Sequence, residues 1–190
     1  MIALHLQSCT CPYPFCRAVF ALWLTLMRTT CSGYRWYDHY QIEPAYCFGH
    51  GESFTSFHYS GLHVSTSAVS LTLQNNGTVA GAEVVQLYLS FPSGAGEPPQ
   101  QLKGFEKVHL EAGESTLVTL GLDARAFSIW MVGTHAWTVV SGTFGVAVGS
   151  SSRDHRLVGS VEVKIADGAV QLKSDDEHER NPAAAAADST

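Results

Sequence analysis

Alternation between apolar and polar side chains over short segments is the feature that most limits what this chain can fold into. In residues 69–74, Val69, Leu71 and Leu73 share one face and polar side chains occupy the other, which is the period of a half-buried β-strand. We expect further strands at residues 83–91, 101–110, 115–122, 143–150 and 156–165. Turns that carry glycine or proline separate them, and a helical period is almost absent. The sequence therefore predicts an all-β fold, an antiparallel β-sandwich.

Three irregular positions interrupt this pattern. Gly104 falls where the alternation of residues 101–110 slips, and it predicts a β-bulge. Residues 92–99 contain prolines, which cannot donate to a strand ladder, and therefore predict a loop. Residues 123–130 predict a single helical turn with Asp123 as its N-cap.

Charge and composition narrow the range of partners. The formal net charge is −6, and no stripe of lysine or arginine follows the strands, which argues against nucleic acid as a partner. Residues 166–190 are acidic and alanine-rich and lack the apolar content to fold alone. We therefore expect a disordered tail there.

The first 32 residues have a different composition from the rest. All 5 cysteines lie at or before Cys47, and their spacing predicts neither a zinc site nor a closed disulfide framework. Residues 18–27 form an uncharged apolar run that is shorter than the roughly twenty residues needed to cross a bilayer, so no membrane partner is expected. Residues 1–32 are left as an irregular, unassigned segment, interpreted either as a poor signal segment or as an artefact of the gene model.

The spacing of polar residues gives no constellation for catalysis. The acids of the strand region, Glu83 among them, fall in turns or singly on strands and are interpreted as solvated surface groups. A G-x-S-x-G elbow and phosphate-binding loops are absent from the sequence. We assign no catalytic, cofactor-binding or metal-ligating residue, and no cofactor.

Two residues stand out as candidate sites of another kind. Trp130 lies beside the expected helical turn and is a candidate glycan contact, whereas Trp137 is expected in the core of the sandwich. Asn76 begins the sequence Asn-Gly-Thr in an expected turn and is a candidate N-glycosylation site.

Several blocks, in the right order over residues 33–160, resemble one enzyme family. They are GYRWYDHYQIEPAYCFGHGESFTSFHYSGL, LTLQNNGTVAGAEVVQLYLS, PPQQLKGFEKVHLEAGESTLVTLGL and WTVVSGTFGVAVGSSSRDHRL. These blocks are similar to the C-terminal part of glycoside hydrolase family 3 β-glucosidases, which hydrolyse terminal β-D-glucosyl residues in the breakdown of cellulose and other polysaccharides. Glu52 and Met131 depart from the pattern of the family.

That resemblance implies an immunoglobulin-like, fibronectin type III-like sandwich at residues 51–165. Residues 33–50 would be the remnant of the preceding α/β domain and the linker from it, with residues 34–38 as an orphan strand. The family's nucleophile and acid/base lie in domains that have no counterpart in this sequence. The chain alone is therefore expected to be an inactive fragment.

The function implied by the resemblance is that of a non-catalytic accessory module that stabilises a secreted β-glucosidase. Its partners would be the barrel and α/β domains of the same enzyme, together with polysaccharide. Two alternatives stay open: a carbohydrate-binding module that uses Trp130, and a protein-interaction sandwich with a large exposed apolar patch.

Overall fold

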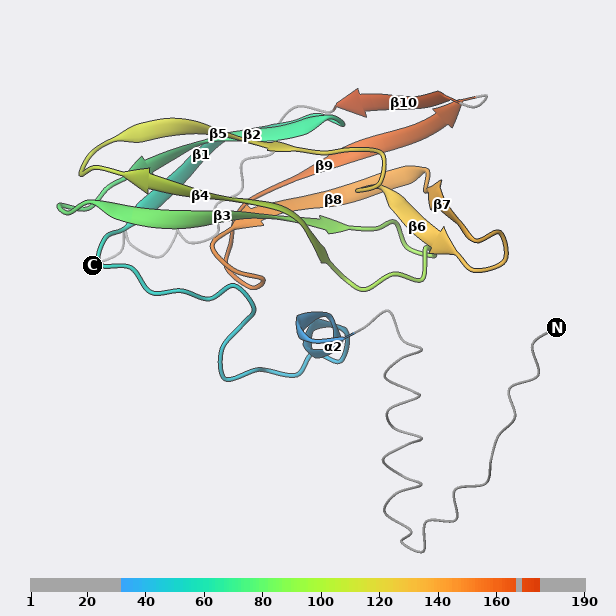
Figure 1. The fold of residues 1–190 in the computed structure, drawn as a ribbon, viewed down its shortest axis with the longest axis horizontal. Coiled ribbons are helices and arrows are strands. Elements are labelled where there is room, and N and C mark those ends of the chain that lie inside the picture. The colour runs from blue at the N-terminus through green and yellow to red at the C-terminus, as the bar shows by residue number, and fades with distance from the viewer. Residues whose placement is uncertain (1–31, 167–168, 175–190) are drawn as a thin grey trace, which may run out of the picture.

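The computed structural model describes residues 32–166 and 169–174, which form two antiparallel sheets packed face to face (Figure 1). One sheet has the strand order β1-β2-β5 and the other β10-β9-β8-β3-β4, while β6 and β7 form a separate hairpin at one end. The elements in chain order are α2 (Tyr34–His39), β1 (Phe57–Val64), β2 (Ala68–Asn75), β3 (Gly81–Ser90), β4 (Gln101–Leu110), β5 (Ser115–Gly121), β6 (Ser128–Met131), β7 (Ala136–Val139), β8 (Gly142–Gly149), β9 (His155–Ala166) and β10 (Ala169–Ser174).

This arrangement confirms the predicted all-β antiparallel sandwich. The six expected strands correspond to β2, β3, β4, β5, β8 and β9, with ends that differ by at most two residues. The bulge expected at Gly104 also forms. Leu87 pairs with Gly104 and Tyr88 pairs with Leu102, which leaves Lys103 without an opposite residue on β3.

Sequence alternation misses four strands. A register shift between Ser60 and His63 breaks the alternation of β1, and β6 and β7 have only 4 residues each, too few for a period to show. β10 lies where the tail was expected to begin, but it pairs with β9, so strand pairing continues beyond residue 165. Residues 1–31 and 175–190 lie outside the described residues.

The core lies between the two sheets and consists of side chains that alternate along their strands. Val69, Leu71 and Leu73 of β2 are fully buried, as their pattern predicts. Phe127 and Phe144 are also buried and meet edge to face, with ring centroids 5.1 Å apart. Full burial of such a side chain is worth about 1.5–3 kcal/mol relative to exposure, so this layer contributes most of the stability of the sandwich.

The second half of β3 is buried on both faces. Its inward side chains reach the core, but Gln86 and Tyr88 on the outer face are also only 4% and 1% exposed. Residues 33–50 run outside the five-stranded sheet and cover this outer face (Figure 1). We call residues 33–50 the covering segment.

Aromatic packing and one amide attach the covering segment to β3. The ring of Tyr34 stacks on that of Phe48, with centroids 4.5 Å apart, and meets the ring of Tyr88 edge to face at 6.2 Å. The side-chain nitrogen of Gln86 donates to the carbonyl of Gly49 (3.1 Å) and to that of Ser150 (2.5 Å). These contacts join three segments that are far apart in the sequence.

A largely buried carboxylate makes the second attachment. Asp38 is 10% exposed, accepts a hydrogen bond from the Gln100 amide (2.9 Å) and pairs with Arg153 (3.2 Å). Arg153 donates further to the carbonyl of Ile42 (2.8 Å). Because loss of one partner would leave a charge unpaired at low exposure, this pair holds the segment in one position.

The orphan strand expected within residues 34–38 is wrong. This stretch belongs to helix α2, in which the amide of Tyr40 donates to the carbonyl of Trp36 (3.1 Å). No neighbouring strand pairs with it among the described residues, so local helical hydrogen bonds satisfy its backbone instead. The helix directs the Tyr34 hydroxyl to accept from the amide of Leu102 (2.8 Å).

Gly49 explains why the covering segment needs a glycine at its end. Its φ of +78° favours glycine, and a Cβ at this position would collide with the side-chain amide of Gln86. The glycine-rich stretch that follows Cys47 therefore serves backbone packing against β3.

Asn75 organises the other end of the sandwich. It is fully buried, and its side-chain nitrogen donates to the carbonyls of Val79 (2.9 Å) and Leu110 (3.2 Å). Its side-chain oxygen accepts from the Thr55 hydroxyl (2.6 Å) and from the amide of Gly77 (3.0 Å). One side chain thus satisfies polar groups of three segments.

We predict that Asn75→Ala lowers the free energy of unfolding by about 2–4 kcal/mol, because several buried groups lose their partner at once. Urea denaturation of the two proteins measures this difference. Asn76→Ala is the matched control: the neighbouring side chain is exposed, and its loss should stay within about 0.5 kcal/mol. Equal effects of the two substitutions would contradict the role of Asn75.

Candidate functional site

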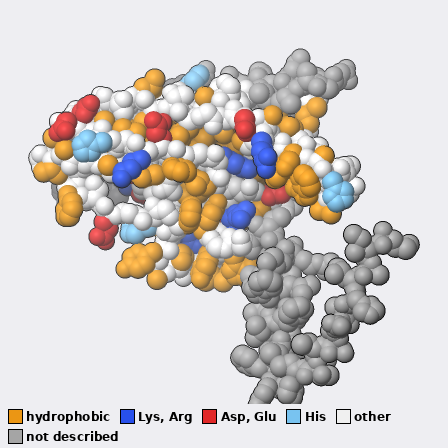
Figure 2. Space-filling view, in the orientation of Figure 1, with side chains coloured by type: hydrophobic (Ala, Val, Ile, Leu, Met, Phe, Trp, Pro, Cys, Tyr) orange, Lys and Arg blue, Asp and Glu red, His pale blue; other side chains and the backbone are white. Residues whose placement is uncertain are grey.

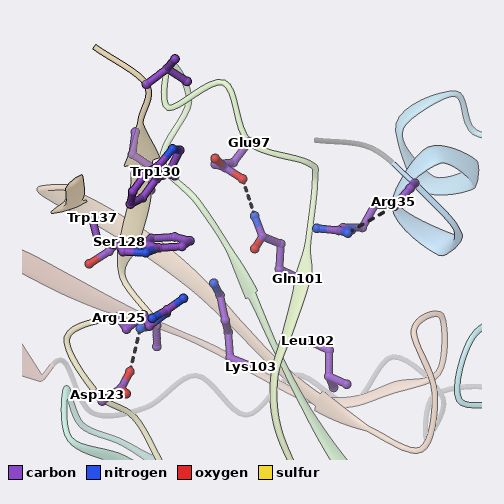
Figure 3. Close-up of a pocket in the computed structure, with 14 residues that line it drawn as sticks. Arg35, Glu97, Gln101, Leu102, Lys103, Asp123, Arg125, Ser128, Trp130 and Trp137 are labelled. Carbon is purple, nitrogen blue, oxygen red and sulfur yellow. Dashed lines mark hydrogen bonds between the residues drawn. The ribbon is translucent and has the colours of Figure 1, made fainter. Parts of the chain in front are cut away.

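A cavity of about 610 Å³ lies where hairpin β6–β7, the start of β4 and helix α2 approach one another (Figure 3). Trp130 and Trp137 line it from the hairpin, Gln101 and Lys103 from β4, and Arg35 from α2. The volume is within the range of pockets that bind small ligands. The candidate glycan contact Trp130 is thus part of a built site.

The two tryptophans form a cross-strand pair. Trp130 of β6 is opposite Trp137 of β7, with ring centroids 5.5 Å apart and planes 60° from parallel. They are 45% and 48% exposed. The expected core position of Trp137 is therefore wrong: β7 belongs to a hairpin outside both sheets, and only its last residue, Val139, packs against the core.

The turn before the hairpin fixes its direction. The Asp123 carboxylate accepts from the amide of Ala126 (2.9 Å), as expected of a cap, and the Ser128 hydroxyl donates to the carbonyl of Ala124 (2.6 Å). The chain then continues directly into β6 without forming a helix. Phe127 is buried in the core at this point and anchors the base of the hairpin.

Three cations face the same cavity. The guanidinium of Arg125 lies over the ring of Trp137, 4.3 Å from its centroid, and Lys103 Nζ lies 4.9 Å from the centroid of Phe91. Burial lowers the pKa of the Lys103 ammonium. In Figure 3, Arg35 points from α2 toward the start of β4 and Lys103 points up between β4 and the hairpin. The bulge at Lys103 thus places an amino group in the cavity.

Two carboxylates reach the cavity that sequence reasoning had kept apart. Glu97 accepts a hydrogen bond from the Gln101 amide (2.6 Å), and Asp123 is engaged by the turn described above (Figure 3). Both are bound to neutral donors. Aromatic faces, cations and acceptors together make a binding surface for a polar ring. Long-range folding brings these groups together, so local spacing carried no signal for them.

Glu83 is a second place where the structure departs from expectation. It is not a solvated acid: it is partly buried and accepts a hydrogen bond from the Tyr59 hydroxyl (2.8 Å). Burial raises the pKa of the Glu83 carboxyl, although the hydrogen bond from Tyr59 opposes that shift. Burial, reinforced by the charge of Glu83, also raises the pKa of Tyr59.

Asn76 lies at the turn after β2. Its side chain is exposed, and its backbone amide donates to the carbonyl of Ser56 (2.8 Å). The structure therefore leaves the side-chain amide accessible.

The described residues contain neither a candidate metal cluster nor a membrane-spanning helix. Among residues 32–166 and 169–174, no three His, Cys, Asp or Glu side chains are grouped so that they could hold a metal ion. No helix in that part of the chain has the length and apolar character to cross a membrane.

Comparison with known proteins places this fold. The family model for the fibronectin type III-like domain matches residues 83–152. The match runs from β3 through β8 of the sandwich. The sandwich and its strand order agree with that assignment.

The curated relatives are much longer proteins. Probable β-glucosidase L of Emericella nidulans is 47% identical over 154 residues, which cover 68% of this chain and 21% of that protein. Probable β-glucosidase D of Aspergillus flavus is 42% identical over 151 residues, which cover 67% of this chain and 20% of that protein. The chain thus spans about a fifth of the length of these relatives.

Solved structures show the same relation. The β-D-glucoside glucohydrolase of Trichoderma reesei has a TM-score of 0.65 and 37% identity over 68% of this chain and 22% of that one. The GH3 β-glucosidase of Bifidobacterium adolescentis also gives 0.65, with 40% identity over 68% and 20%. This chain matches the fibronectin type III-like region of glycoside hydrolase family 3 β-glucosidases, as its motifs predict.

We predict a pH-dependent effect of Glu83→Gln. A carboxyl whose pKa is raised by folding contributes stability that is complete below its unfolded value and is lost as pH rises through the folded value. The substitution removes that loss, so the variant should gain stability relative to the parent chain from pH 4 toward neutrality. Urea denaturation from pH 4 to 8 measures the two curves.

Glu106→Gln is the control, because Glu106 is an exposed carboxylate on the neighbouring strand β4. Its curve should follow that of the parent chain. A constant difference between Glu83→Gln and the parent across this pH range would rule out the proposed burial effect.

Proposed function

We propose that this chain is a non-catalytic accessory module that stabilises a family 3 β-glucosidase. The observation that carries the proposal is the two-sided covering segment with the residues just after it. Its inner side packs on β3, while its outer side exposes large apolar residues: Tyr37, Tyr40, Ile42, Tyr46, Phe48 and Phe54. Such a patch is typical of an interaction surface.

The patch is concentrated on one side of the molecule. Figure 2 shows hydrophobic side chains gathered along the lower edge, where Figure 1 places α2 and the chain that follows it. Phe54 has no cover at all and Tyr46 is 77% exposed. Contact with another domain would remove this apolar area from water. Each Å² of buried apolar surface stabilises such a contact by about 25 cal/mol.

The partner in this proposal is the remainder of the same enzyme, its barrel and α/β domains. Residues 33–50 act as the link to the preceding domain, and residues 51–165 are the accessory domain itself. Secretion of the enzyme and N-glycosylation at Asn76 belong to the same proposal, since the side chain of Asn76 is exposed at a turn.

A second function, carbohydrate binding, is favoured by a different observation. The cavity beside Trp130 offers indole faces together with polar groups, and polysaccharide is its proposed ligand. A general protein-interaction module is the third reading, and the apolar patch described above would serve it equally.

The test uses β-glucosidase L of Emericella nidulans without the region that matches this chain. Alone, the chain should not hydrolyse an aryl β-glucoside even at high concentration. Added to the shortened enzyme, it should slow heat inactivation of the hydrolytic activity. A Tyr46→Ser/Phe54→Ser double variant should need at least about tenfold more chain for the same protection, because two exposed aromatics lose their contact.

Leu117→Ser is the matched control, since Leu117 is 69% exposed on β5 of the opposite sheet. It should protect as well as the parent chain. Hydrolysis by the chain alone would overturn the non-catalytic assignment, and a lack of protection by the parent chain would overturn the stabilising role.

We predict that secretion from a yeast host adds an endoglycosidase-sensitive glycan at Asn76. Asn76→Gln should abolish the shift in gel mobility on glycosidase treatment. Thr78→Ser, which keeps the sequon, should retain it. Absence of such a shift in the parent chain would contradict glycosylation at Asn76.

A further inference from the structure

The cavity beside the tryptophan pair is lined by three cations and two carboxylates, in a chain whose formal net charge is −6. Arg35, Lys103 and Arg125 line it, each from a different part of the chain. None of the ion pairs found among the described residues involves any of them. Three cations face two carboxylates, Glu97 and Asp123, so the lining keeps an excess of positive charge for an anionic ligand.

The burial of Lys103 makes a counter-ion more valuable at this point. The ammonium sits over Phe91 and is partly withdrawn from water. Glu97 and Asp123 attract this ammonium, but neither forms an ion pair with it among the described residues. An anion at contact distance would therefore relieve its partial desolvation. A neutral ligand would not.

The hairpin supplies flat apolar walls for a ring. Trp130 and Trp137 are both about half exposed at the mouth of the cavity. Arg125 is already stacked on Trp137, which limits the freedom that its guanidinium would lose on binding. In Figure 3 the indoles stand on one side and Glu97 and Gln101 on the other, with Lys103 between them.

Hydroxyl groups of a ligand would also find partners. Glu97 has a carboxylate that accepts from Gln101 and retains capacity for further donors. A ring that carries both hydroxyls and one carboxylate would therefore match the two sides of the cavity, whereas a flat aromatic anion would leave Glu97 unused.

We propose that this cavity binds a uronic-acid residue of an acidic polysaccharide. The sugar ring rests against Trp130 and Trp137, its carboxylate pairs with Lys103 and Arg35, and its hydroxyls donate to Glu97. This proposal rests on the carbohydrate-binding function proposed above. The cavity shares Arg35 with the covering segment but none of the exposed apolar residues of the patch, so the accessory role and uronide binding can fail separately.

The test measures binding of trigalacturonate to the full chain by calorimetry and tryptophan fluorescence. Its methyl ester, in which each carboxylate is replaced by a neutral ester, is the matched ligand. The acid should bind at least about tenfold more tightly than the ester, because a hydrogen-bonded ion pair replaces a neutral contact. Raising the salt concentration should weaken binding of the acid and leave binding of the ester unaffected.

Two variants assign the contacts. Lys103→Met keeps an apolar side chain near Phe91 and removes the charge. It should weaken binding of the acid about tenfold and leave binding of the ester unchanged. Trp130→Ala should weaken binding of both ligands roughly fivefold to tenfold. Lys107→Met, at an exposed position of the same strand, is the control and should bind like the parent chain. Thermal unfolding checks that each variant is folded.

Three results would overturn the proposal. They are equal affinity for acid and ester, unchanged binding by Lys103→Met, and absence of trigalacturonate binding while an oligoglutamate peptide binds. The last result would assign the cavity to an acidic segment of a protein.

Discussion

Burial of β3 on both faces is the constraint on which the rest of this structure depends. A strand of an antiparallel sandwich ordinarily shows one face to solvent, and the polar Gln86 lies on what would be that face. Here the face is closed, so Gln86 must find partners inside the protein. It finds them in two backbone carbonyls and in the Tyr88 hydroxyl, which donates to its oxygen at 2.7 Å. The covering segment is therefore part of the folded unit.

One irregularity links that segment to the cavity. The bulge lies at Lys103, between Leu102 and Gly104. The amide of Leu102 donates to Tyr34, and the amino group of Lys103 enters the cavity. Without the extra residue, the register would shift by one and the side chains on one side of the bulge would lie on the opposite face of the sheet. Attachment of α2 and placement of a cation thus share one local distortion, and Arg35 arrives at the cavity because α2 is attached there.

The sequence could predict much of the fold because most of its strands are half-buried and regular. The β2 pattern of Val69, Leu71 and Leu73 determines a face without reference to any other part of the chain. Trp137 shows where such reasoning stops: an aromatic residue in an apolar run fits a core strand and an isolated hairpin equally well. Whether a sheet lies opposite is a property of the whole topology, not of the run.

Only one residue of the candidate site could be predicted from the sequence, because the site also depends on the whole topology. Trp130 could be selected by type, but Glu97 and Arg35 reach it from a loop and a helix that are distant in the sequence. The helix itself was mistaken for a strand, because its six residues have no partner that local spacing could reveal. Convergence of this kind needs the packed structure.

The hairpin carries a consequence for how such domains diverge. Its two strands pair with each other and with neither sheet, and only its base, at Phe127 and Val139, meets the core. Changes at its tip therefore leave the packing between the sheets intact. Relatives can vary the chemistry at this end of the sandwich, generation by generation, while natural selection for a stable domain acts elsewhere in the chain.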